Sequence, residues 1–146
     1  MRLQISSQRH QRTRRDHSTE TAEDYVEAVA ELIDEKGSCR VTDLASHFAV
    51  SHVTVSKTVA RLKTAGYLES EPYRPIELTR KGRRVANESR KRHKIVFDFL
   101  LALGIGKTVA EMDAEGMEHH VSPETLARFQ AFVENASKND SKQSKD

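Results

Sequence analysis

The side chains with the clearest chemical potential lie in one short stretch, Glu115-Gly116-Met117-Glu118-His119-His120. On a helix, residues three or four apart share a face, so Glu115, Glu118 and His119 are expected to point the same way. Two carboxylates and an imidazole suit divalent cations such as Mn²⁺ or Fe²⁺. A solvated polar face is the alternative, because short motifs also match by chance. The stretch therefore predicts a metal site only if the rest of the chain supplies further ligands.

Candidate ligands stand at two other places in the chain. Asp24 and Glu27 are three residues apart in the amphipathic stretch Ala22–Lys36, which we expect to be helical and to end at Gly37. They also suit an acidic surface near a helix start, where the dipole favours carboxylates. His93 stands alone in the middle of a long helical stretch, where a histidine is more often a plain polar residue.

Composition limits the class of protein. The chain has 146 residues, of which 36% are hydrophobic and 32% charged, so we expect one domain, with or without an appended element. The low apolar content indicates either that part of the chain is disordered or that a partner subunit completes the core. No apolar run approaches the roughly 20 residues of a membrane span, and no secretory signal is evident, so a cytoplasmic protein without a membrane partner is expected. Cys39 is the only cysteine, which excludes an intrachain disulfide and predicts a free thiol near a loop.

The two ends of the chain are polar and carry most of the basic excess. Residues 1–17 hold five arginines against Asp16. A basic arm of this kind can contact nucleic acid, or it can serve only to keep the protein in solution. Because neither end has an apolar period, we expect residues 1–18 and 137–146 to be disordered.

A helix-turn-helix is expected between Thr42 and Ala65. Thr42 can cap a short helix, a break follows at Ala49–Ser51, and Ser51 can cap a second helix over His52–Ala65. The first turns of such a second helix enter the major groove of DNA, although an ordinary helical hairpin would show the same pattern. The expected DNA-binding residues of this segment are Ser51, His52, Val53, Thr54, Ser56 and Lys57.

The next segment supports the DNA-binding interpretation. Two short alternating stretches, Tyr67–Glu71 and Ile76–Thr79, flank a loop with prolines and predict a β-hairpin. A hairpin directly after a recognition helix is a wing, and Arg74 at its tip is placed to reach a phosphate or the minor groove. Residues 19–80 are therefore expected to form a winged helix-turn-helix domain that binds double-stranded DNA.

Three helices are expected in residues 81–136. The first, from Arg80 to about Leu103, is basic and then broadly apolar, and Lys107–His120 follows after a glycine break. Ser122 and Pro123 begin the last helix, for which we predict burial of Leu126, Phe129, Phe132 and Val133. An apolar helical domain of this kind is a natural homodimer interface. The predicted fold class is mainly α with a small β wing.

The order of these parts resembles the diphtheria-toxin-repressor family of metal-dependent transcriptional regulators, and within it the manganese transport regulators. The resemblance covers roughly residues 21–135 and rests on four stretches: Glu23–Glu27, Val53–Val59, Arg92-His93 and Asp113–His120. In that family the metal lies between the first helix, the long helix and the helix after it. The metal ligands that the resemblance implies are Asp24, Glu27, His93, Glu115, Glu118 and His119.

The resemblance also implies a mechanism and a metal. Oxygen donors at Asp24 and Glu115 favour Mn²⁺, with Fe²⁺ or Co²⁺ as substitutes and one or two ions per subunit. Metal binding would join the two halves of each subunit of a homodimer, which then binds a palindromic operator and represses manganese-uptake genes. His120 is expected to support the site or to be structural.

Two other functions fit parts of the pattern. Carboxylates and imidazoles on helices also build di-metal oxidase sites, but these usually repeat a Glu-x-x-His pair, which this sequence lacks, so an enzyme is not expected. A winged-helix repressor that senses an organic ligand would leave the acidic groups as ordinary surface. DNA binding that persists in a chelator would favour that second alternative.

Overall fold

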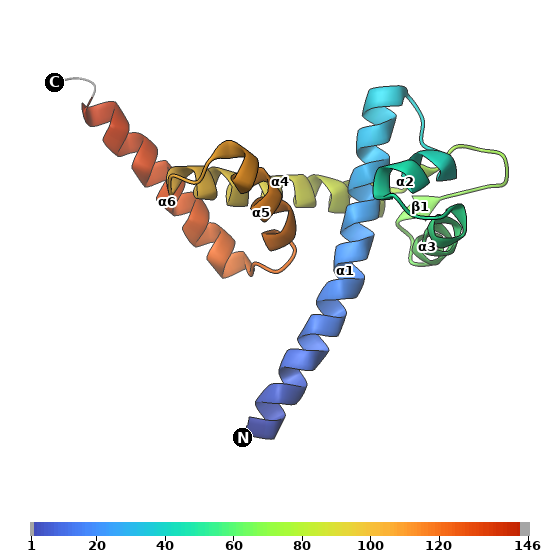
Figure 1. The fold of residues 1–146 in the computed structure, drawn as a ribbon, viewed down its shortest axis with the longest axis horizontal. Coiled ribbons are helices and arrows are strands. Elements are labelled where there is room, and N and C mark those ends of the chain that lie inside the picture. The colour runs from blue at the N-terminus through green and yellow to red at the C-terminus, as the bar shows by residue number, and fades with distance from the viewer. Residues whose placement is uncertain (1, 144–146) are drawn as a thin grey trace. The chain divides into compact units, whose positions relative to one another are not determined.

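The computed structural model describes residues 2–143, except for the side chains of residues 2–3, 12–18 and 143. The chain forms two compact units that meet between Glu88 and Ser89, and Figure 1 shows their helices and the small hairpin. This boundary lies inside helix α4, later than the boundary we predicted after residue 80. The mainly helical fold class with a small β wing is confirmed.

Helix α1, Arg2–Lys36, is longer than predicted. We expected it to begin near Thr19–Thr21 after a disordered arm, but residues 2–18 continue the helix. No glycine or proline interrupts residues 2–36, and extending a formed helix costs far less than starting one. At the other end, α6, Pro123–Gln143, continues into the tail for which we expected disorder. The arginine side chains at 12, 14 and 15, and residues 144–146, lie outside the described part of the chain.

The core of the first unit lies between α1, α2 (Val41–Phe48) and α3 (His52–Thr64). The apolar stripe of α1 is buried as its spacing predicted, and the ring of Tyr25 stacks on that of Phe48 with centroids 4.6 Å apart. Burying one such side chain contributes about 1.5–3 kcal/mol. Helix α3 buries Val55, Val59 and Leu62, whose spacing of four and three residues places them on one face.

The ends of α2 and α3 give the helix-turn-helix its geometry. The Asp43 carboxylate accepts the Arg40 backbone N–H at 2.9 Å, so α2 begins at Val41 after Arg40, and our prediction that Thr42 caps it is wrong. The break falls at Ala49, whose φ of 53° is left-handed. Ser51 caps α3 as predicted, because its Oγ accepts the Thr54 N–H at 3.1 Å.

The wing is an antiparallel pair of strands, β1 (Leu68–Glu69) and β2 (Glu77–Leu78). Thr79 caps α4, Arg80–Ala102, because its Oγ1 accepts the Gly82 N–H at 3.0 Å. A Cβ at Gly82 would overlap the carbonyl oxygen of Tyr67, so this position accepts only glycine without movement of the backbone. The wing and α4 are therefore fixed to each other inside the first unit.

Cys39 lies at the base of the wing. Its carbonyl accepts the Ile76 N–H at 2.7 Å, and its side chain is fully buried in the core. Burial, with a smaller contribution from the negative charge of Asp43, raises the pKa of the thiol to about 11. The predicted free cysteine is confirmed, and it is an apolar core residue.

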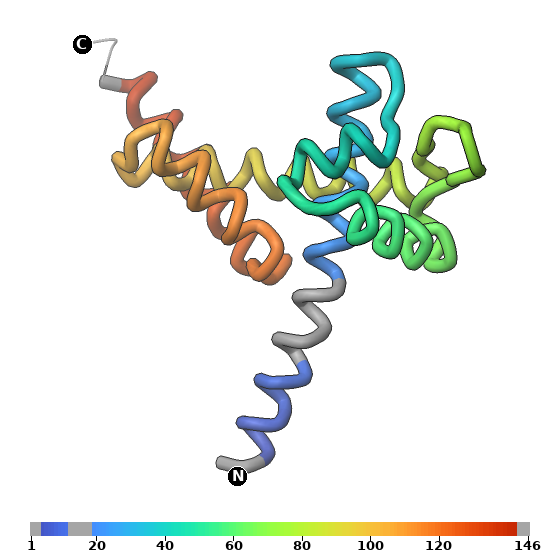
Figure 2. The backbone as a smooth tube through the Cα atoms, turned by 45° about the vertical axis from the view of Figure 1, so that its right-hand side comes forward, coloured from blue at the N-terminus to red at the C-terminus, as the bar shows by residue number. Residues whose placement is uncertain are grey.

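The second unit consists of the C-terminal half of α4, α5 (Lys107–Met117) and α6, whose paths Figure 2 traces. Helix α4 ends at Ala102, and in the turn after it Gly104 has φ of +90°. There the Gly104 N–H bonds to the Leu101 carbonyl and the Ile105 N–H to the Leu100 carbonyl. This Schellman-type turn leads the chain into α5. No helix in the described residues is both long and apolar enough to span a membrane.

The core of the second unit is small. Ala110 and Ala114 of α5 are fully buried against Val96 and Leu100 of α4. The aromatic residues of α6 are only partly covered: Phe129 stacks on Phe99, while Phe132 remains 45% exposed. Our prediction that α6 buries Phe132 is therefore wrong for a single chain.

Candidate metal centre and nucleic-acid interface

Three of the predicted ligands converge inside the second unit. The Nδ1 atom of His93, on α4, lies 3.0 Å from Glu118 Oε2 and 3.5 Å from Glu115 Oε2. One donor atom from each of the three residues lies within 4.8 Å of the others. Two carboxylate oxygens and one imidazole nitrogen form a donor set that suits Mn²⁺ or Fe²⁺.

Helix packing brings these side chains together. His93 lies one turn before Val96 on α4, and Glu115 follows the fully buried Ala114 on α5. The small alanines of α5 pack against the apolar residues of α4. The Gly104 turn makes the two helices antiparallel neighbours, so the start of the apolar half of α4 meets the end of α5.

Glu118 and His119 occupy the most enclosed part of this group. The Glu118 side chain is fully buried and that of His119 is 2% exposed, and Glu118 Oε1 lies 3.4 Å from His119 Nε2. Burying an ionised carboxylate costs free energy unless a cation or hydrogen-bond donors compensate its charge. A carboxylate that has imidazole nitrogens on both sides is therefore well suited to hold a cation.

The end of α5 differs from our prediction. The helix stops at Met117, Glu118 is its C-terminal cap, and residues 118–120 form a turn. Glu118 still has a helical backbone, with φ of −57° and its N–H bonded to the Ala114 carbonyl, so Glu115 and Glu118 share a face as predicted and both reach His93. His119 lies in the turn that follows, and α4 supplies a further imidazole. His120 is exposed, with its ring 6.5 Å from that of His119.

The remaining two predicted ligands belong to the first unit. Asp24 and Glu27 lie one turn apart on α1, and both are partly buried. The structure thus gathers His93, Glu115, Glu118 and His119 in the second unit, and it places Asp24 and Glu27 as a pair in the first.

Sequence reasoning missed one residue beside this group. The carboxylate of Glu111 lies 3.0 Å from Nε2 of His93, on the other edge of the imidazole ring. Glu111 precedes Glu115 by four residues, so the helical spacing that picked out Glu115 and Glu118 also pointed to it.

The predicted DNA-binding residues all lie on the surface of the first unit. Ser51, His52, Val53, Thr54, Ser56, Lys57 and Arg74 are each exposed. Val53 is 63% exposed, which is unusual for an apolar side chain and leaves it free to contact a thymine methyl group. Helix α3 contains no acidic residue, and Lys57, Arg61 and Lys63 are exposed on it, so this face is positively charged.

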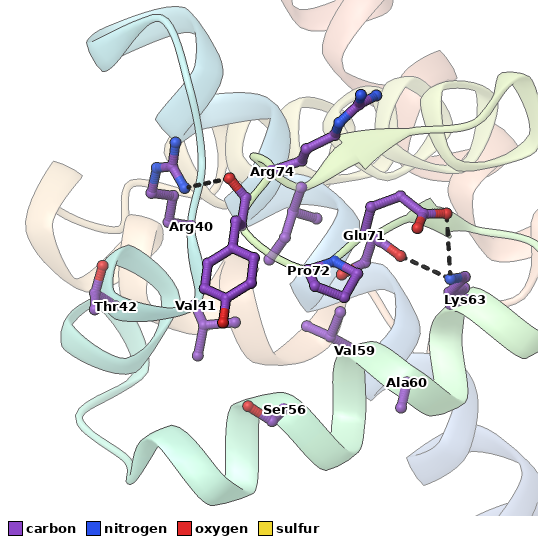
Figure 3. Close-up of a pocket in the computed structure, with 13 residues that line it drawn as sticks. Arg40, Val41, Thr42, Ser56, Val59, Ala60, Lys63, Glu71, Pro72 and Arg74 are labelled. Atoms are coloured by element: carbon purple, nitrogen blue, oxygen red, sulfur yellow. Dashed lines mark hydrogen bonds and ion pairs between the residues drawn. The ribbon is translucent and has the colours of Figure 1, made fainter.

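A groove of about 510 Å³ lies between α3, the start of α2 and the wing. Figure 3 shows Ser56 and Ala60 on one wall and Arg40 and Thr42 on another, with the side chain of Arg74 extending away from the groove. Lys63 Nζ donates a hydrogen bond to the carbonyl oxygen of Ser70 at 2.7 Å. This contact holds the wing against α3.

Two residues of this groove were not among our predictions. Arg40 donates to the carbonyl oxygen of Tyr73 at 3.5 Å, and the Tyr73 side chain is 99% exposed at the tip of the wing, with φ of +64°. The proline-flanked loop marked this tip in the sequence, but which of its side chains stands out depends on the turn.

Two domain models of one protein family match the chain, one on each side of residues 77–78. Residues 17–76 match the N-terminal DNA-binding domain of the iron-dependent repressors, and residues 79–145 match the metal-binding and dimerisation domain of the same family. The chain is 48% identical over 118 residues to the transcriptional regulator MntR of Escherichia coli O6:H1, covering 81% of this chain and 76% of that protein. It is 37% identical over 126 residues to the HTH-type regulator MntR of Shouchella clausii, covering 84% and 88%.

Solved structures show the same fold. A manganese-dependent transcriptional repressor in complex with manganese matches with a TM-score of 0.69 and 28% identity, and the manganese regulator SloR with 0.67 and 25%. Each match covers 77% of this chain but only about half of the solved chain, 52% and 53% respectively.

Proposed function

We infer that this chain, which belongs to the iron-dependent repressor family, represses transcription in response to Mn²⁺. The observation that carries the inference is the group of His93, Glu115 and Glu118, because it lies in the region that matches the family's metal-binding domain. The proteins named MntR that the chain matches are transcriptional regulators, which supports a regulator over an enzyme.

The donor atoms support manganese as the metal. Both carboxylates near Nδ1 of His93 offer oxygen, and Cys39, the only cysteine, is buried in the other unit with its pKa raised to about 11. A site built from carboxylate oxygen and imidazole, without thiolate, selects harder ions such as Mn²⁺ or Fe²⁺. We propose Asp24, Glu27, His93, Glu115, Glu118 and His119 as the ligands, for one or two ions per subunit.

In this proposal the ligands come from both units. Without a cation, the carboxylates of Asp24 and Glu27 and those of Glu115 and Glu118 repel one another. A bound cation supplies positive charge that both sets share. The residues of α1 and those of α4–α5 then hold the two units in one arrangement, so the DNA-competent state becomes more populated.

We propose that the active form is a homodimer on double-stranded operator DNA. Six large apolar side chains of the second unit are exposed in the single chain: Leu101, Leu103, Ile105, Val109, Met112 and Phe132. An exposed apolar surface of this size indicates a protein interface. A dimer must present its two α3 helices about 34 Å apart to read the two halves of a palindrome.

A DNA-binding titration tests the proposal. The probe is a palindromic duplex selected from a random library in the presence of Mn²⁺, and its affinity is measured by fluorescence anisotropy with Mn²⁺ and with a chelator. We expect Mn²⁺ to tighten binding at least about tenfold, which corresponds to about 1.4 kcal/mol of coupling. Equal affinities in Mn²⁺ and in chelator would overturn the proposal and favour a repressor that senses another ligand. Parallel titrations with Fe²⁺, Co²⁺ and Zn²⁺ rank the metals.

A further inference from the structure

The imidazole of His93 has a carboxylate at both of its nitrogen atoms. Nδ1 lies 3.0 Å from Glu118 Oε2 and 3.5 Å from Glu115 Oε2, and Nε2 lies 3.0 Å from Glu111 Oε1. The ring itself is 22% exposed and lies nearly parallel to that of Phe97, with the centroids 6.3 Å apart. Contacts therefore fix both the position of the ring and the direction of each nitrogen.

A neutral imidazole has one N–H and one lone pair, and the two nitrogens exchange these roles between tautomers. A cation held by Glu115 and Glu118 meets His93 at Nδ1, so Nδ1 must carry the lone pair and Nε2 the proton. When Nδ1 carries the proton instead, it donates to these same carboxylates, and the ring cannot bind the cation. The tautomer of His93 therefore decides whether it can act as a ligand.

We propose that Glu111 is a positioning residue that selects the metal-binding tautomer of His93, because its carboxylate accepts the Nε2–H and leaves the Nδ1 lone pair facing Glu115 and Glu118. The inference rests on the proposed metal site and adds to it a residue that is not a ligand. A carboxylate behind a metal-binding histidine fixes the ring and raises its basicity.

Geometry distinguishes this role from that of a ligand. The two nitrogens of an imidazole point to different edges of the ring, so an atom within 3.0 Å of Nε2 is directed away from the cation at Nδ1. Glu111 is one turn before Glu115 on α5, and its side chain is 58% exposed. Because it contributes little to the core, it can be replaced without threatening the fold.

The first test measures the tautomer in the metal-free protein. Long-range ¹H–¹⁵N correlation spectra, with the His93 signals assigned by comparison with His93→Gln, distinguish the two tautomers directly. We expect Nε2 to carry a proton in the wild type, where Glu111 accepts it, and in Glu111→Gln, whose amide oxygen still accepts a hydrogen bond. Glu111→Ala should shift the ring toward the Nδ1–H form. An unchanged tautomer in Glu111→Ala would overturn the proposal.

The second test measures Mn²⁺ affinity without DNA, by calorimetry and by the electron paramagnetic resonance signal of free Mn²⁺. Glu111→Ala should weaken binding about 10- to 100-fold, and Glu111→Gln less than about threefold. The control is Asp113→Ala, which removes the same charge from an exposed position on the same helix and should bind as the wild type does.

The outcomes separate this inference from the proposed function. A wild-type affinity in Glu111→Ala would overturn the positioning role alone. Equal losses in Glu111→Ala and Glu111→Gln would also overturn it, because they would make Glu111 a direct ligand. A wild-type protein that binds no Mn²⁺ would overturn the proposed function, while the tautomer measurement would still decide the role of Glu111.

Discussion

The first unit has sixteen buried residues in its core cluster and the second has four, among the residues whose side chains the structure describes. The contrast extends to the surface. The second unit exposes six large apolar side chains, whereas in the first unit the most exposed ones, Val53 and Tyr73, lie on the face that we assign to DNA. The first unit thus has the larger core, and the exposed apolar side chains of the second unit form the surface that we propose a partner subunit covers.

Because the two units differ in this way, substitutions in each unit should change a different measured quantity. Changes in the first unit should act on its free energy of unfolding, and changes on the exposed apolar face of the second unit should act on association. Tyrosine fluorescence can follow the first unit alone, because the three tyrosines, Tyr25, Tyr67 and Tyr73, all lie in it and the chain has no tryptophan.

The largest effect is expected from Gly82→Ala. The new Cβ would overlap the Tyr67 carbonyl oxygen and lie 3.3 Å from Leu78 Cδ2, so α4 must move away from the wing. We expect a loss of about 3 kcal/mol in the free energy of unfolding of the first unit, measured by urea denaturation with tyrosine fluorescence. The control is Gly116→Ala, whose Cβ meets nothing within 4 Å, and both variants are also followed by far-ultraviolet circular dichroism, which reports the helices of both units. A stability of Gly82→Ala within about 0.5 kcal/mol of the wild type would show that the wing and α4 are not rigidly packed.

The next effect concerns the incomplete face of the second unit. Met112 is 72% exposed on α5, and Met112→Glu would place a charge on the surface that we expect a second subunit to cover. The dimer dissociation constant, measured by analytical ultracentrifugation, should rise at least about 30-fold, or about 2 kcal/mol. Gln130→Glu adds the same charge at an exposed position of α6 and should leave the dimer intact if that position lies outside the interface. Unchanged association of Met112→Glu would exclude Met112 from the interface.

A smaller effect is expected at the start of α2. The hydrogen bond from the Arg40 N–H, helped by Lys36, lowers the pKa of Asp43 below 3.8. A lowered pKa in the folded state means that Asp43 stabilises the protein above pH 3.8 and that this contribution is lost as the pH falls through the folded-state pKa. Asp43→Ala should cost the first unit about 1 kcal/mol at pH 7.

The comparison with Asp43→Asn separates charge from hydrogen bonding. The asparagine can still accept the Arg40 N–H, so it should keep most of the stability and lose the dependence on acidic pH. Equal stability of Asp43→Ala and the wild type at pH 7 would mean that this contact does not fix the start of α2.

The sequence predicted well those features that local chemistry determines. Ser51 caps α3 as its hydroxyl suggested, and the amphipathic spacing in Ala22–Lys36 indicated the part of α1 that buries Tyr25, Val26 and Val29. Capping and periodicity depend on residues close together in the chain, so they can be read from the sequence alone.

Other features depend on tertiary packing and were therefore missed. Helical spacing does not show where a helix stops without a glycine or proline at its end, so α5 was extended past Met117. The contact between His93 and Glu111 requires that α4 and α5 be neighbours, which no spacing within either helix reveals. Phe132 stays 45% exposed although its ring contacts that of Phe99, because helical spacing shows which residues share a face and not what covers that face.

The central claim is the proposal that bound Mn²⁺ couples the two units, and Asp24→Ala tests it most directly. Operator affinity should be measured with and without Mn²⁺ for the wild type, for Asp24→Ala in the first unit and for Glu115→Ala in the second. The account predicts that each variant loses the Mn²⁺ response while keeping the wild-type unfolding curve and the metal-free DNA affinity. A full Mn²⁺ response in Asp24→Ala would contradict the account, because the cation would then act within the second unit alone.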